Sequence, residues 1–148
     1  MNEEEQPTRY ITGVMARGLV DFVGSMATGL GGDVADVLIV SFVGGQSTRA
    51  MMDDRYLAQR YGYEARVMPN EERKPTSIRE ICDTLNMKRE TVRRRLVRLE
   101  AEGWLLKVDG GFIQPAQVGE NDQTKALRQI VVKKANRLVR DLEKLRQP

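Results

Sequence analysis

The segment from residue 75 to residue 115 constrains the fold most, because signals for helix, turn and helix follow one another there without a gap. Ser77 and Glu80 form a capping-box pattern, which predicts that a helix begins at this point. Apolar residues continue at helical spacing as far as Leu85. Asn86 follows, and asparagine tolerates the left-handed backbone that a tight turn requires. We therefore expect a short helix that ends in a sharp turn.

A second helix and a hairpin are predicted directly after this turn. The helix spans about residues 88–102 and ends at Gly103, since glycine is common just after the end of a helix. Two short apolar runs within residues 104–114 flank the pair Asp109-Gly110, and Asp-Gly is a strong signal for a tight hairpin turn. The segment is therefore expected to fold as helix, turn, helix and two-stranded hairpin.

The second predicted helix carries an intense positive charge. Residues 88–100 contain six basic and two acidic side chains, a net charge of +4, whereas the whole chain has a net charge of +3. With successive residues turned by about 100°, Val92, Leu96 and Leu99 fall on one side and define the buried face. The basic patch favours a polyanionic partner, although a solvated helix face is the simpler explanation of a charge run in general.

The run of residues 77–105 resembles the bacterial winged helix-turn-helix regulators. Cys82 stands at the small position of their first helix, and Leu85-Asn86-Met87-Lys88 corresponds to their turn, with asparagine where they usually have glycine. Thr91-Val92 matches their second helix, the recognition helix, and Leu99-Glu100-Ala101-Glu102-Gly103 matches its end. This resemblance implies a small β-wing after the recognition helix, which would lie in the major groove of double-stranded DNA.

The rest of the chain has a layout loosely similar to the MarR type. Apolar spacing predicts a helix over residues 8–28, a buried helix over residues 34–43 that Asp33 caps and Gly44-Gly45 ends, and a long helix over residues 121–146. The resemblance implies a homodimer joined through terminal helices. We therefore expect a mainly α fold with a small β-wing: a winged helix-turn-helix flanked by N- and C-terminal helices.

The expected domain organisation follows from these elements. The connecting segment before residue 75 is predicted to hold a short helix over residues 51–61 and a solvent-exposed linker over residues 69–75. All parts of the 148-residue chain are expected to pack as one domain. The parts are a polar tail (1–8), N-terminal helices with the connecting segment (9–74), the winged helix-turn-helix DNA-binding core (75–116) and a C-terminal helix for dimerisation (117–148).

The second helix supplies most of the candidate DNA-binding residues. An arginine can donate two hydrogen bonds to O6 and N7 of guanine, and each such pair contributes about 1–3 kcal/mol to base discrimination. Arg95 lies nearer the buried edge and is expected to reach a phosphate or an internal carboxylate. The residues expected to read bases or to lie against them are Arg89, Glu90, Thr91, Arg93 and Arg94, and those expected to contact phosphates are Lys88, Arg98 and Lys107.

Composition argues against several classes of function. The chain has no histidine, and Cys82 is its only cysteine, so we expect no intrachain disulfide, no metal site and no cofactor. Cys82 itself is expected to be a buried structural thiol, because a redox sensor needs an exposed thiolate. No nucleophile and base stand at a recognisable spacing, so we expect no enzyme.

Two remaining groups of residues can be interpreted either as structural or as part of a binding site. Asp53-Asp54 is more simply a solvated turn or a helix start than a magnesium site. Tyr56, Tyr61 and Tyr63 cluster in the connecting segment, where packing is the simpler interpretation and a pocket for a small-molecule effector is the sharper one. The acidic N-terminus is not a secretory signal, and no apolar run is long enough to cross a membrane, so a cytoplasmic protein is expected.

The sequence therefore predicts a homodimeric DNA-binding transcriptional regulator, with a repressor as the first expectation. The residues do not reveal its operator, its effector or its direction of regulation. Two alternatives stay open. One is a winged helix used as a protein-interaction or assembly module, and the other is an architectural protein that binds DNA without sequence preference.

Overall fold

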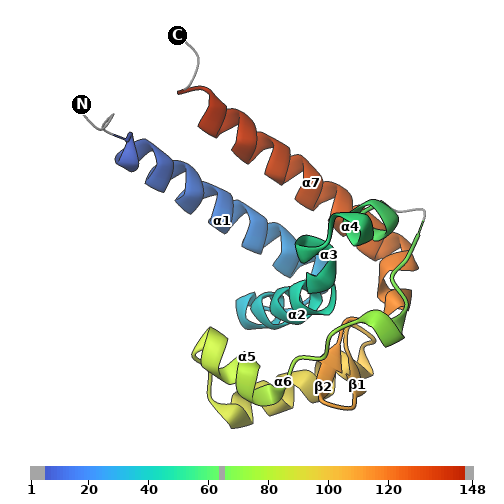
Figure 1. Cartoon of the computed structure of the whole chain (residues 1–148). Coiled ribbons are helices and arrows are strands. Elements are labelled where there is room, and N and C mark those ends of the chain that lie inside the picture. Colours follow the sequence, from blue (N-terminus) through green and yellow to red (C-terminus); the bar gives the residue numbers. More distant parts are fainter. Residues whose placement is uncertain (1–5, 64–65, 146–148) are drawn as a thin grey trace.

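The computed structural model of the chain describes residues 6–63 and 66–145, which fold mainly into helices with one small antiparallel sheet (Figure 1). The predicted mainly helical fold with a two-stranded sheet is confirmed. Most of the predicted polar tail, residues 1–5, lies outside the described residues, as does the predicted helix end beyond residue 145. The elements are α1 (Thr8–Leu30), α2 (Val34–Ser47), α3 (Arg49–Asp53), α4 (Arg55–Tyr61), the 3-10 turn η1 (Asn70–Glu72), α5 (Ile78–Leu85), α6 (Arg89–Ala101), β1 (Leu106–Val108), β2 (Gly111–Ile113), the 3-10 turn η2 (Ala116–Glu120) and α7 (Asp122–Glu143).

Helices α1 and α7 pack side by side and project from the rest of the molecule, and we call this pair the arm (Figure 1). The hydroxyl of Tyr10, near the start of α1, donates a hydrogen bond to the carbonyl oxygen of Asp141, near the end of α7, at 2.7 Å. At the opposite ends, the side-chain amide of Gln123 donates to the carbonyl oxygen of Gly29. The two helices therefore run antiparallel along their whole lengths.

Helix α2 lies between the arm and the rest of the molecule and contributes four apolar residues to the core. Asp33 caps its N-terminus as predicted, in a capping box with Asp36. The helix continues through Gly44 and Gly45 to Ser47, so the predicted end at these glycines is wrong. A glycine inside a helix costs only about 1 kcal/mol relative to alanine. Here Gly44 lets the side chain of Gln114 approach closely, since a Cβ atom on Gly44 would lie 3.0 Å from it.

The connecting segment differs from its prediction in two places. The single helix expected over residues 51–61 is two helices, because the carboxylate of Asp54 accepts hydrogen bonds from the amides of Tyr56 and Leu57 and so starts α4 anew. The linker expected to be exposed is fastened to the body by Arg73, which is half-buried and donates to the carbonyl oxygens of Met68 and Gln114. Burial lowers the pKa of the Arg73 guanidinium.

One hydrophobic core joins α2, α5, α6 and the hairpin. The hairpin is antiparallel, with Leu106 opposite Ile113 and Asp109-Gly110 in the turn, as predicted. The buried apolar residues of this core are Leu30, Val37, Ile39, Val40, Val43, Ile81, Val92, Leu96, Leu99, Trp104, Leu105, Phe112, Val118 and Leu127. Cys82 packs against them but is only partly buried, so its predicted burial holds in part.

No single described helix is both long enough and apolar enough to cross a membrane. Among the described helices, α1 and α2 are the one pair that would reach that length and composition together, and they are bent by 94° at the break between them.

Candidate nucleic-acid interface

The turn between α5 and α6 forms as its residues predict. The Ser77 hydroxyl oxygen accepts a hydrogen bond from the amide of Glu80 at 3.1 Å, and the carboxylate of Glu80 reaches back to the amide of Ser77. Asn86 takes the left-handed conformation, with φ of 52°, and ends α5. Lys88 is extended and precedes the first turn of α6, so the chain reverses within three residues.

Helix α6 buries the face that the sequence predicts. Val92, Leu96 and Leu99 are almost fully buried and belong to the same core as Ile81 of α5 and Val37 of α2. Apolar contacts on this side hold α6 to the body, so its other side is free to face solvent. That outward side is where a binding partner would meet the helix.

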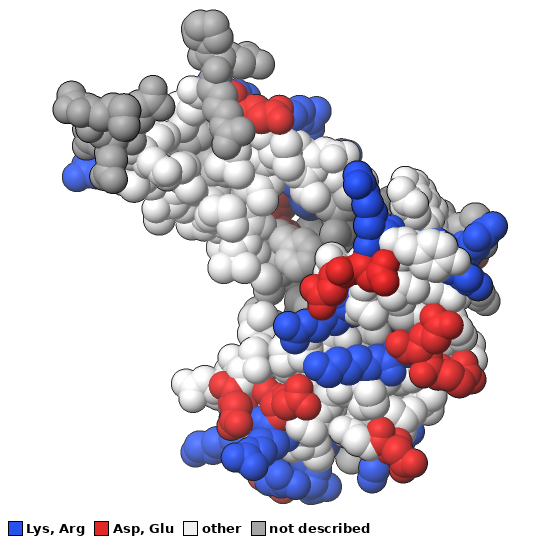
Figure 2. All heavy atoms as spheres, in the orientation of Figure 1, with Lys and Arg blue, Asp and Glu red and all other residues white. Residues whose placement is uncertain are grey.

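The outward side of the first two turns of α6 is strongly basic. The exposed side chains there are those of Lys88, Arg89, Glu90, Arg93 and Arg94. Glu90 is an exception in charge: its carboxylate pairs with the guanidinium of Arg93 at 2.7 Å, and that hydrogen bond holds the pKa of Glu90 below its ordinary value. In Figure 2, blue basic groups gather at the lower end of the molecule, where Figure 1 shows α5 and α6.

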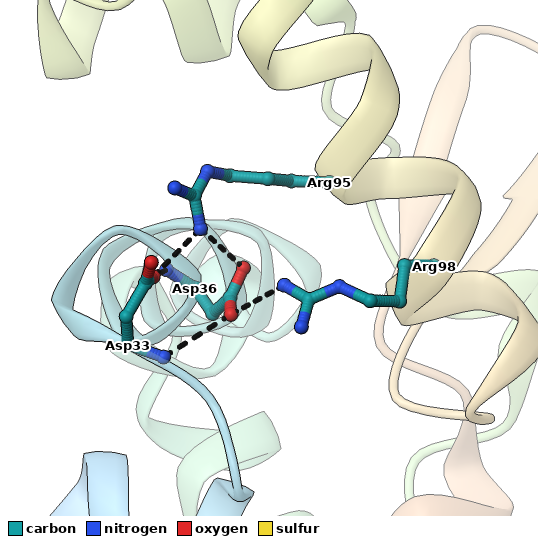
Figure 3. A network of polar contacts seen from close by, with 4 residues as sticks. All are labelled: Asp33, Asp36, Arg95 and Arg98. Atoms are coloured by element: carbon teal, nitrogen blue, oxygen red, sulfur yellow. Dashed lines mark hydrogen bonds and ion pairs between the residues drawn. The ribbon is translucent and has the colours of Figure 1, made fainter.

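A second group of arginines on α6 turns inward, toward the start of α2 (Figure 3). Nη1 of Arg95 lies 2.6 Å from a carboxylate oxygen of Asp33 and 3.0 Å from Oδ1 of Asp36. Nη2 of Arg98 lies 2.5 Å from Oδ2 of Asp36. We call these four residues the α2–α6 ion network. It joins two elements whose residues are about sixty positions apart in the chain.

Asp36 is the buried centre of this network, with only 1% of its side chain exposed. A buried carboxylate is costly unless cations and hydrogen-bond donors surround it. Here it receives both guanidinium groups and the backbone amide of Asp33, at the N-terminal end of a helix, which favours negative charge. Asp33 is more exposed, and the hydrogen bond from Arg95 holds its pKa below the ordinary value of 3.8.

The structure divides the eight candidate DNA-binding residues into three places. Lys88, Arg89, Glu90, Thr91, Arg93 and Arg94 lie together at the start of α6, and of these only Thr91 is half-buried. Arg98 lies in the α2–α6 ion network. Lys107 is exposed on β1, and its backbone amide donates to the carboxylate of Glu100 at 2.9 Å, which ties the hairpin to the end of α6.

The acidic partners of α6 are the residues that the sequence did not reveal. Arg95 was expected to reach either a phosphate or an internal carboxylate, and it reaches the carboxylates of Asp33 and Asp36. The signal in the sequence is the pair of aspartates three positions apart at the start of α2, but that spacing is equally explained by helix capping.

A cavity of about 640 Å³ opens between the arm and the body. Tyr61 and Tyr63 line it, together with Trp104 and the basic side chains of Arg66 and Arg73. The third tyrosine of the predicted cluster, Tyr56, is exposed on α4 and accepts a hydrogen bond from Arg60 through its hydroxyl. A small-molecule effector for this cavity stays a prediction from the sequence.

Among residues 6–63 and 66–145, no group of three or more acidic or cysteine side chains lies close enough to hold a metal ion. No protein-family model matches the chain, and neither a curated protein nor a solved structure matches it.

Proposed function

We propose that this chain is a transcriptional regulator that binds double-stranded DNA as a homodimer, with α5, α6 and the hairpin acting as a winged helix-turn-helix. Helix α6 is the recognition helix and lies in the major groove. The observation that carries this proposal is the basic, outward side of α6 opposite a face fully packed into the core. A dimer that covers two successive major grooves excludes other proteins from that DNA, so we propose a repressor.

The dimensions of α6 suit the major groove. Its 13 residues span about 20 Å, and the groove is about 12 Å wide, which admits one helix with its side chains. Arg89, Arg93 and Arg94 are exposed near the N-terminal end, where helices of this kind meet base edges. Within the described part of the chain, neither Lys88 nor Arg89 has a carboxylate partner, so both are available to phosphates.

The hairpin supports the same assignment. Lys107 is exposed on β1, and the hydrogen bond from its amide to Glu100 fixes β1 beside the end of α6. A cation in this place can contact the phosphates that flank the groove, and such contacts set the register of the protein on the duplex. Lys107 is therefore the phosphate contact from the wing.

The arm is the proposed dimer interface. Apolar side chains are exposed on both of its helices, among them Leu19 at 62% and Val20 at 73% on α1, and Val132 and Val139 on α7. On the face that Figure 2 shows, the described part of the arm is mostly uncharged. A second arm packed against these residues makes a four-helix bundle, the arrangement in which a helix pair buries its remaining apolar side. To enter two successive major grooves, the two recognition helices of such a dimer must lie about 34–36 Å apart, one turn of DNA.

Fluorescence anisotropy of the purified protein with genomic DNA fragments and with a random duplex, over a salt series, tests the proposal. A dimer that neutralises about six phosphates loses on the order of a thousandfold in affinity between 50 and 200 mM salt. Steep salt dependence with a preference for some fragments is the expected result. Equal binding to all fragments would instead indicate an architectural DNA binder. Absence of binding at low salt would leave α6 as a docking face for a protein partner.

A further inference from the structure

The α2–α6 ion network constrains α6 in a way that its apolar face does not. Val92, Leu96 and Leu99 are held by apolar contacts, which depend on buried area and have little directional preference. The hydrogen bonds of Arg95 and Arg98 are directional, and bonds between two charged groups are the strongest of this kind. The network therefore adds a directional constraint on the rotation of α6 about its own axis to the constraint that the core supplies.

The two arginines act as a pair because of their spacing. Arg95 and Arg98 are three positions apart, so they lie on the same side of α6, and both reach the single carboxylate of Asp36. A rotation of α6 that brought one guanidinium closer to Asp36 would carry the other away. Figure 3 shows the two side chains approaching Asp36 from neighbouring turns of the helix.

Arg98 is bound to Asp36 although 45% of its own side chain is exposed. A DNA phosphate would compete for that guanidinium. If Arg98 left, Oδ2 of Asp36 would keep only the 3.2 Å hydrogen bond from the amide of Asp33, and Arg95 alone would pair with the carboxylate. Leaving a buried carboxylate short of partners is strongly unfavourable. This cost favours the pairing of Arg98 with Asp36 over a contact with a DNA phosphate.

The network also lies directly after the arm. Helix α1 ends at Leu30, Gly31 takes a left-handed conformation, and Asp33 caps α2 two residues later. Only three residues, 31–33, separate α1 of the arm from α2. The ion pairs at the start of α2 then link it to the recognition helix. In a dimer held by its arms, these contacts set how each α6 meets its half of the DNA site.

We propose that Asp36 is a positioning residue for DNA recognition, which holds Arg95 and Arg98 so that the rotation of α6 is fixed relative to the arm and neither arginine contacts a phosphate. This inference rests on the proposed function.

The first test is the ratio of affinities for a preferred fragment and for a random duplex, measured with the variant Asp36→Asn. Asparagine keeps an oxygen that can accept from the amide of Asp33 but lacks the charge that holds two arginines. We expect the ratio to fall at least tenfold, with the random-duplex affinity unchanged or raised, because the released arginines become available to phosphates. Circular dichroism checks that the variant is folded. If Asp36 had a purely structural role, the folded variant would have a lower melting temperature and an unchanged affinity ratio. An unchanged ratio would overturn the inference.

Asp53→Asn is the matched control. Its side chain is 74% exposed and pairs with Arg49 on α3 at 3.9 Å, outside the α2–α6 ion network. We expect its affinity ratio to stay within about threefold of the wild type. An equal loss in both variants would show that the loss of any negative charge, rather than the buried centre at Asp36, changes recognition, and would overturn the assignment to Asp36.

The salt dependence of Arg98→Gln tests the second half of the proposal. Each phosphate contact contributes about 0.9 to the slope of log affinity against log salt concentration. We expect the slope to match that of the wild type, because Arg98 is engaged internally. A slope reduced by about that amount per protomer would identify Arg98 as a phosphate contact and overturn the proposal.

If a single variant does not fold, the double variant Asp36→Asn with Arg98→Gln replaces it in both tests. The double variant removes the charges of both partners, so neither partner is left as an unpaired charge. We expect the same tenfold loss of preference and an unchanged slope; retained preference in folded protein would overturn the proposal. If the wild type binds no DNA, the proposed function fails and this inference fails with it. If the wild type prefers some fragments and the folded variants keep that preference, only this inference fails.

Discussion

Gly111 and Thr76 pass so close that a Cβ atom on Gly111 would lie 2.1 Å from the carbonyl oxygen of Thr76. Thr76 forms an isolated bridge with β2 here, since the amide of Phe112 donates to the same oxygen at 2.8 Å and the carbonyl oxygen of Phe112 accepts from the amide of Thr76. Gly111 also has φ of 141°, which side chains rarely tolerate. Gly111→Ala is therefore expected to lower the free energy of unfolding by about 3 kcal/mol or more.

Urea unfolding followed by circular dichroism measures this loss, and Gly45→Ala is its control. Gly45 lies within α2, and a Cβ atom there would meet nothing within 4 Å. Alanine is favoured over glycine by about 0.5–1 kcal/mol inside a helix, so this variant is expected to be slightly more stable than the wild type. Equal stability of the two variants would contradict the close approach at Gly111.

The arm predicts the effect of a charge at the proposed dimer interface. Leu19→Glu places a carboxylate on a face that would be buried between two copies, so we expect the mass in sedimentation equilibrium to fall from dimer to monomer. Met52→Glu makes the same kind of change at an exposed apolar residue of α3, outside the arm, and is expected to leave the dimer intact. A wild type that is monomeric at micromolar concentration would rule out this interface.

The outward side of α6 predicts a loss of DNA affinity on removal of one charge. Arg94 is 72% exposed and its nearest carboxylate, that of Glu90, is 4.0 Å away. With Arg94→Gln we expect the affinity for a preferred fragment to fall by about 1–3 kcal/mol, with a weaker preference among sequences. Arg49→Gln on α3 changes the same charge on another surface and should bind nearly as the wild type does. Equal losses in the two variants would show that overall charge, not α6, accounts for binding.

Asp33 predicts a pH dependence of stability with a definite sign. Its pKa in the folded chain is lowered from 3.8, because Arg95 donates a hydrogen bond to the carboxylate. The unfolded chain therefore takes up this proton at higher pH than the folded chain does. Asp33 then stabilises the fold fully above pH 3.8, and this contribution is lost as the pH falls through its lowered pKa.

Urea unfolding of the wild type and of Asp33→Asn at several pH values measures this contribution. The wild type should be the more stable of the two at pH 7, and the difference should shrink below pH 3.8. A difference that is the same at pH 7 and pH 2.5 would mean that the charge of Asp33 does not contribute. Aspartate in the wild type and asparagine in the variant both cap α2, so the comparison isolates the ion pair between residue 33 and Arg95.

Local signals explain why the α5–α6 segment could be predicted closely. The capping box at Ser77, the left-handed turn at Asn86 and the apolar spacing of Val92 and Leu96 each involve residues within one or two turns of helix. Patterns over such short distances determine local conformation directly. The candidate residues at the start of α6 lie together for the same reason.

The ends of helices in the N-terminal half were harder to predict, because tertiary contacts override weak local preferences. Gly44 and Gly45 suggest a helix end, but α2 continues because Ser47, beyond them, is fixed by the amide of Gln114. Asp54 breaks an otherwise continuous helical pattern with its own capping hydrogen bonds. At both positions, the sequence alone is compatible with a helix that ends and with a helix that continues.

The partners of Arg95 and Arg98 could not be predicted, because charge and spacing do not identify a partner in a distant element. Asp36 is separated from Arg98 by 62 positions, and an aspartate in the first turn of an apolar helix is usually explained by capping. Only the packing of α2 against the elements around α6 buries this carboxylate and so requires two cations beside it.

The pairing of α1 with α7 determines the order in which the chain can assemble. Tyr10 and Asp141, which meet at the end of the arm, are 131 positions apart, so a ribosome adding about 5–20 residues per second makes the second on the order of ten seconds after the first. During that time α1 exists without the helix that packs against it, while the segments from α2 to the hairpin are being synthesised. The side of α1 that α7 later covers is thus exposed to chaperones and to other nascent chains. If the proposed dimer forms, polysomes that bring two such helices together would favour assembly between copies synthesised side by side.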